Sequence, residues 1–133
     1  MPKPFPLRAK GFHKFGDLIG LEFRKFERGY SQCFLQINED HFNPHNVVHG
    51  GVLYSMADTG MGAALYSLLE KDELCATIEI KINYFKSVKD KVLICDTKVI
   101  HKGKTIGVLE SEILNEDTLV AKAYGTFSIF KVK

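Results

Sequence analysis

The chain has 133 residues, close to the commonest size of a single domain, so it can bury a hydrophobic core without disulfides or metals. Hydrophobic residues make up 45% and charged residues 26%, a balance that excludes a disordered chain. The net charge of +2, with no long basic run and no zinc-finger spacing, argues against nucleic acid as a partner.

The first fifteen residues have the composition of an extended arm. Prolines at positions 2, 4 and 6 remove backbone donors, and no continuous apolar run follows them as in a signal peptide. We therefore expect an arm over residues 1–15 and one domain over residues 16–133. The cysteines are odd in number, widely spaced and form no CxxC pair, which is typical of reduced thiols in a cytoplasmic protein.

The remaining chain predicts strands around one helix. Alternation over Leu21–Asn38 predicts one long strand, and Glu39–Asn46 has loop composition. After Gly50 and Gly51, the run Val52–Leu69 has the length and composition of a helix. It is too short for a membrane span and contains a carboxylate, so no membrane span is expected. Four more strands are predicted, roughly at Cys75–Phe85, Lys91–His101, Thr105–Leu114 and Leu119–Phe130.

This order of elements predicts an α+β fold in which an antiparallel sheet wraps around one long central helix. The helix is apolar nearly all round, so most of its faces should be buried. Its remaining face must also meet something, and a second copy of the same chain is the simplest candidate.

Asp58 is the one carboxylate in this apolar helix, and an unpaired buried carboxylate costs several kcal/mol. Two interpretations stay open. Asp58 can be structural, as a cap or as the partner of a base such as Lys81. It can instead be functional, as a carboxylate in a dry cleft that orients or deprotonates a water molecule.

Gly50 and Gly51 favour the functional interpretation. The first N–H groups of a helix lack intrahelical partners, and glycine lets a ligand carbonyl approach them closely, as an oxyanion would require. Gly50 and Asp58 are eight residues apart, about 12 Å along a helix, which is too far for one carbonyl to touch both. We therefore expect Asp58 to work with the Gly50 of another subunit.

Histidines at positions 41, 45 and 49 have the spacing of metal ligands on a helix, but Pro44 and the glycine pair indicate a loop, so no metal is expected. His49 should shape the turn that enters the helix. His13 and His101 receive no role. No nucleophile elbow and no phosphate-binding glycine loop occur. Lysines at strand ends form a solvated face, or, less favoured, meet the phosphates of coenzyme A.

The spaced set Asn43, His49-Gly50-Gly51 and Asp58 resembles the signature of hotdog-fold acyl-CoA thioesterases, in the group of the phenylacetate-pathway enzyme and thioesterase superfamily member two. The likeness extends over about residues 20–131. It implies a hotdog fold, a dimer or dimer of dimers with shared sites, and acyl-CoA hydrolysis without a bound cofactor, coenzyme A being part of the substrate.

The resemblance also implies roles for single residues. Gly50 would donate its N–H to the thioester carbonyl, and Asp58 would be general base or nucleophile. Asn43 would hold the thioester or the water, His49 would support the loop, and Thr77 would position water.

Two departures and two alternatives accompany the resemblance, and the proline-rich arm is the first departure. Lys86–Lys91 replaces a turn that often contains proline in relatives, which leaves the contact to the coenzyme A nucleotide open. A non-catalytic acyl-CoA binding module and an enoyl-CoA hydratase on the same fold are the alternatives. The acyl group is also open, whether aryl, medium-chain or long-chain.

Overall fold

The computed structural model describes residues 11–132, so most of the predicted arm lies outside the described residues. A short helix crosses the expected boundary at residue 15. No helix in the described part of the chain is long and apolar enough to cross a bilayer. The elements are α1 Lys14–Ile19, β1 Leu21–Glu27, β2 Tyr30–Gln36, the 3-10 helix η1 Glu39–His41, α2 Gly50–Tyr66, β3 Glu73–Tyr84, β4 Val92–Lys102, β5 Ile106–Asn115 and β6 Thr118–Lys131.

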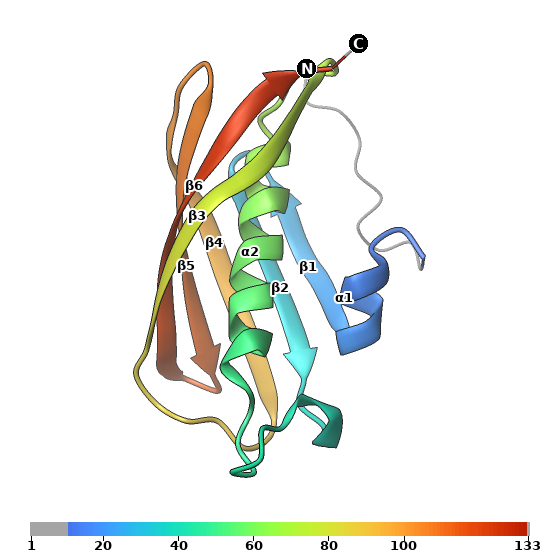
Figure 1. Ribbon diagram of the computed structural model, residues 1–133, viewed down its shortest axis with the longest axis vertical. Coiled ribbons are helices and arrows are strands. Elements are labelled where there is room, and N and C mark those ends of the chain that lie inside the picture. The colour runs from blue at the N-terminus through green and yellow to red at the C-terminus, as the bar shows by residue number, and fades with distance from the viewer. Residues whose placement is uncertain (1–10, 133) are drawn as a thin grey trace.

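All strands join one antiparallel sheet of six strands in the order β1-β2-β4-β5-β6-β3. The sheet curves around α2, which lies along its concave side (Figure 1). The predicted α+β hotdog architecture is confirmed. Because β3 is last in the order, one edge of this 12-residue strand has no neighbour within residues 11–132.

The predicted single strand over Leu21–Asn38 is wrong, because the chain turns back at Gly29 and forms two strands. Gly29 has a φ of 79°, a conformation that glycine adopts readily, and Glu27 pairs with Tyr30 across the turn. The four strands predicted after the helix are confirmed, each within about two residues of its ends.

Helix α2 begins at Gly50, two residues before the predicted start, and ends at Tyr66. Most of its apolar side chains are buried against the sheet, as predicted. A strip along the opposite side stays partly open and includes Tyr54, Ser55, Asp58 and Thr59. Asp58 therefore sits at the border of the core and not inside it.

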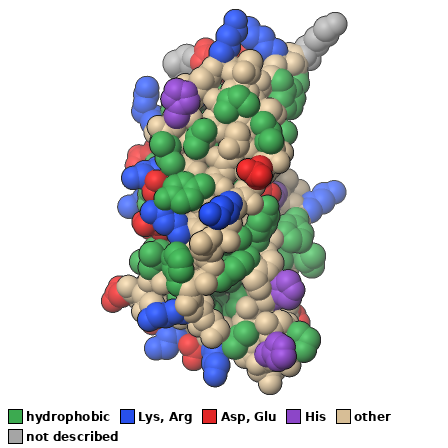
Figure 2. Space-filling view, turned by 60° about the vertical axis from the view of Figure 1, so that its left-hand side comes forward, with side chains coloured by type: hydrophobic (Ala, Val, Ile, Leu, Met, Phe, Trp, Pro, Cys, Tyr) green, Lys and Arg blue, Asp and Glu red, His purple; other side chains and the backbone are tan. Residues whose placement is uncertain are grey.

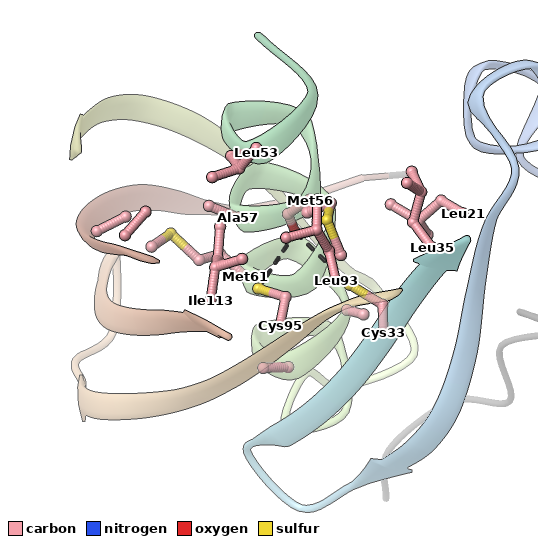
Figure 3. Close-up of a cluster of buried hydrophobic side chains, with 14 of the residues drawn as sticks. Leu21, Cys33, Leu35, Leu53, Met56, Ala57, Met61, Leu93, Cys95 and Ile113 are labelled. Carbon is pink, nitrogen blue, oxygen red and sulfur yellow. Dashed lines mark hydrogen bonds between the residues drawn. The ribbon is translucent and has the colours of Figure 1, made fainter. Parts of the chain in front are cut away.

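Small residues let α2 approach the sheet closely. Cys33 and Cys95, partners on β2 and β4, are free, buried thiols that both point at the Met56 carbonyl oxygen, at 3.8 and 3.7 Å (Figure 3). One turn later, Ser31 donates to the Gly60 carbonyl oxygen at 2.7 Å. The backbone of α2 is therefore hydrogen-bonded to the sheet as well as packed against it.

Gly60→Ala should destabilise the fold, because the new methyl group would lie 2.7 Å from Thr97 Oγ1, a buried hydroxyl that is hydrogen-bonded to Ser111. Overpacking of this kind costs about 1–3 kcal/mol. The free energy of unfolding in urea measures the change.

Gly62→Ala is the matched control two residues along the same helix. Its methyl group would meet nothing closer than Phe127 Cε2 at 3.9 Å, so the higher helix propensity of alanine should leave stability equal or raise it by up to about 1 kcal/mol. A Gly60→Ala protein as stable as the Gly62→Ala protein would contradict the close packing at Gly60.

Candidate active site

Two separate hollows hold Gly50, Asp58 and Thr77, three of the five predicted catalytic residues. The first, which we call the Gly50 groove, is an open groove of about 270 Å³ at the start of α2. The second, the Asp58 pocket, has about 260 Å³ and lies near the middle of α2. The Gly50 groove is lined by Val48, Gly50, Leu53, Tyr84, Phe85, Lys86, Ser87 and Val88, and the Asp58 pocket by His13, Asp58, Thr59, Gly62, Ala63, Cys75, Ala76, Thr77 and Phe127.

The first three N–H groups of α2 differ in their hydrogen-bond partners. The His49 ring caps the helix, with Nδ1 accepting a hydrogen bond from the Gly51 N–H at 2.7 Å. The Val52 N–H donates to the His49 carbonyl oxygen at 2.9 Å. The Gly50 N–H finds no acceptor among residues 11–132, so it is the donor left at the positive end of the helix dipole.

Tyr84, the last residue of β3, holds the same helix start from the other side. Its hydroxyl donates to the Gly50 carbonyl oxygen at 2.8 Å. A methyl group added at Gly50 would lie 3.1 Å from the Tyr84 ring, so the ring covers the glycine directly. Burial, and to a smaller extent the nearby Tyr54, raises the pKa of Tyr84, which keeps its hydroxyl a donor.

Asp58 is half-buried and is bound by β3. Its Oδ1 accepts a hydrogen bond of 2.6 Å from the Thr77 hydroxyl, and no ion pair joins it to Lys81, although the structure describes both. The pairing with Lys81 that the structural interpretation offered is therefore absent, and Thr77 is the partner instead. The structure does bring Asp58 and Thr77 together, and the second carboxylate oxygen accepts no hydrogen bond from the described residues.

The structure does not bring Asp58 to Gly50 within one chain. Eight residues of α2 separate them, about 12 Å along the axis, and they line different hollows. Within one chain the Gly50 N–H and the Asp58 carboxylate therefore lie in different hollows.

Asn43 and His49 have structural tasks in the described chain. Asn43 Oδ1 accepts from the backbone N–H of His45 at 2.8 Å, and its own N–H donates to the Val47 carbonyl oxygen, so it closes the turn that leads to α2. Asn43 lines neither the Gly50 groove nor the Asp58 pocket. His49 shapes the entry turn as predicted, through its cap.

Sequence reasoning missed two residues near these hollows. Tyr84 was visible only as an aromatic residue at the end of a predicted strand, and nothing in its spacing indicates a bond to Gly50. His13 received no role, yet it lines the Asp58 pocket. It lies 45 positions before Asp58 in the chain, so only the tertiary fold brings the two residues to one pocket.

Comparisons with known proteins agree on a family. A match to the thioesterase superfamily covers residues 45–122, more than half of the chain. The Saccharolobus solfataricus protein SSO1253 is 34% identical over 116 residues, which are 86% of this chain and 77% of the relative. A 1,4-dihydroxy-2-naphthoyl-CoA hydrolase of Listeria monocytogenes is 28% identical over 75% of this chain and 81% of its own.

Solved structures share the fold. The conserved protein PA5202 of Pseudomonas aeruginosa has 35% identity and a TM-score of 0.85 over 88% of this chain and 94% of its own. The thioesterase HI1161 of Haemophilus influenzae has a TM-score of 0.90 at 22% identity, over 98% of this chain and 94% of its own. With its six-stranded sheet around α2, the chain belongs to the thioesterase superfamily and is a hotdog-fold enzyme that hydrolyses thioesters.

Proposed function

We propose that the protein hydrolyses acyl-CoA thioesters at sites shared by two subunits, with Asp58 as general base and the Gly50 N–H as oxyanion donor. The observation that carries the proposal is the start of α2, where the neighbouring Gly51 N–H is used by His49 and the Gly50 N–H has no acceptor among residues 11–132. An N–H held in place before the reaction stabilises the oxyanion without a cost of reorganisation.

Asp58 suits the task of activating water. The Thr77 hydroxyl fixes Oδ1 at 2.6 Å, and the pocket is lined on its other sides mainly by small or apolar residues. A carboxylate held by one hydrogen bond keeps its other oxygen for the proton of an attacking water molecule. Thr77 would then orient Asp58 and the water together.

The free edge of β3 supports a shared site. An exposed 12-residue edge offers unpaired N–H and C=O groups, and Ile78 on this strand is 57% exposed. Hydrophobic side chains lie along the side of the molecule that Figure 2 brings forward. A second copy pairing there in antiparallel fashion would cover this edge by a two-fold contact.

The register of that pairing follows from two hydrogen bonds. On β3, Thr77 is the residue hydrogen-bonded to Asp58, and Tyr84 is the residue hydrogen-bonded to Gly50. A two-fold axis that pairs Lys81 with its own copy, with Ile78 as the extra residue of the β-bulge in this strand, would place Thr77 opposite Tyr84 of the partner subunit. Asp58 would then face Gly50 of the partner subunit, which completes the site twice per dimer.

Coenzyme A as the thiol carrier is supported by the Gly50 groove. Lys86 and Ser87 line it beside the free N–H, and an exposed lysine at position 89 follows. Lysine and hydroxyl donors suit phosphate oxygens. The Listeria monocytogenes relative is named as a hydrolase of a CoA thioester, which agrees with this carrier.

In the proposed reaction, water attacks the thioester carbonyl carbon while Asp58 takes one of its protons. The negative charge that forms on the carbonyl oxygen is met by the Gly50 N–H, and the carbon–sulfur bond then breaks with its electron pair on sulfur.

Asp58→Asn should lower kcat for acyl-CoA hydrolysis by about 10²–10⁴, because an amide cannot take the proton from water. The fold should persist, since the amide oxygen can still accept from Thr77. Release of free thiol from a panel of acyl-CoA esters measures the change. Asp96→Asn is the control, because Asp96 also accepts a hydroxyl hydrogen bond, from Tyr30, but outside both hollows.

Gly50→Pro tests the oxyanion donor. Proline lacks the N–H yet fits the first position of a helix, and His49, with φ −63° and ψ 136°, already has the conformation preferred before proline. We expect kcat to fall by about 10²–10³. Gly50→Ala adds a similar contact to Tyr84 and keeps the N–H, so it should lose much less. Equal losses in the two variants would count against the donor role.

Mixed dimers test whether the site is shared. A dimer of one Gly50→Pro chain and one Asp58→Asn chain has one intact and one doubly damaged site, so random mixing should restore about a quarter of wild-type activity. Refolding or co-expressing the two variants and assaying thiol release gives the answer. No recovery in a mixture shown to contain the mixed dimer would mean that each chain completes its own site.

A further inference from the structure

His13 is the histidine that lines the Asp58 pocket, where it joins Asp58 and Thr77 from the segment before α1. We infer that His13 is the proton-transfer partner of Asp58, giving a proton to the leaving thiolate. The inference rests on the proposed function and adds a residue to it.

The ring of His13 differs from that of a structural histidine in its contacts. The buried His41 uses both ring nitrogens: Nδ1 accepts from the Asn38 N–H at 3.0 Å, and Nε2 donates to the Ile19 carbonyl oxygen at 2.7 Å. His13 Nδ1 is buried without a hydrogen-bond partner in the described chain. A ring placed only to stabilise the fold would satisfy this atom. Nδ1 lies against Gly16, so Nε2 is the ring nitrogen left to carry a proton in the Asp58 pocket.

Gly16 makes room for this ring. It is a buried glycine inside α1, although glycine is the poorest helix former after proline. A methyl group at position 16 would fall on His13 Nδ1, in direct overlap with the ring. Glycine at position 16 therefore lowers the helix propensity of α1, but any larger residue there would displace the His13 imidazole.

The chemistry of the hydrolysis has a place for a second proton carrier. Asp58 gains one proton when water attacks, and the sulfur needs one when the carbon–sulfur bond breaks. An imidazolium at His13 would give its proton to sulfur, and neutral His13 would then recover a proton from Asp58 across the pocket. The products are a carboxylic acid and a free thiol, and both residues return to their starting states.

Replacing the imidazole tests the inference. His13→Ala should lower kcat by about 10²-fold with little change in KM, and added imidazole should restore part of it by entering the space left by the ring. His13→Gln, which retains polar contacts but cannot carry a proton, should show a similar loss. His101→Ala, an exposed histidine on β4, is the control and should behave as wild type.

Gly16→Ala tests whether the position of the His13 ring matters, because in this variant the imidazole is still present but is displaced. We expect a loss of kcat similar to that of His13→Ala, without rescue by imidazole, in a protein whose circular dichroism and melting temperature show an intact fold. His13 variants that keep kcat within about twofold of wild type, or a loss that imidazole does not relieve in His13→Ala, would overturn the inference. If His13 variants keep their activity while Asp58→Asn is inactive, only the role of His13 is contradicted. If Asp58→Asn is itself fully active, the proposed function is contradicted as well.

Discussion

The rest of the structure depends on the orientation of the peptide group between Gly50 and Gly51. Its N–H is held by the His49 ring and its carbonyl by the Tyr84 hydroxyl, so a helix cap and the end of a strand set its plane. A glycine pair alone would be free to rotate at the start of a helix. Bound on both sides, it aims the preceding N–H in one direction and ties α2 to the edge strand β3.

The rest of the architecture maintains this geometry. Helix α2 lies in the concave sheet on small residues, and the sheet supplies hydrogen bonds to helix carbonyl oxygens at Met56 and Gly60. Strand β3 then contacts α2 at two heights, through Thr77 at Asp58 and through Tyr84 at Gly50. The spacing of Gly50 and Asp58 along the helix is therefore repeated along the strand by Tyr84 and Thr77, and through this repetition the proposed two-fold contact would bring Asp58 to Gly50 of the partner subunit.

The helix and the last four strands could be predicted from the sequence because they depend on local pattern. The glycine pair and the lone carboxylate were visible as exceptions to an apolar run, and their helical separation predicted that they lie apart in one chain, as the two hollows show. The hairpin at Gly29 was missed because alternation continues on both sides of the turn and only a positive φ breaks it. The roles of Tyr84 and His13 were missed because their contacts, to Gly50 and within the Asp58 pocket, are tertiary. Such contacts produce no periodic pattern in the sequence.

The hydrogen bonds from the sheet to the helix backbone have a consequence for how such an enzyme can diverge. They fix the rotation and the height of α2 through its main chain and through side chains on its inner face. The outer strip, with Tyr54, Ser55 and Thr59, takes no part in that attachment. Substitutions there leave these hydrogen bonds intact, so under the proposed function the outer strip could change with the substrate while the helix backbone keeps Gly50 and Asp58 in place.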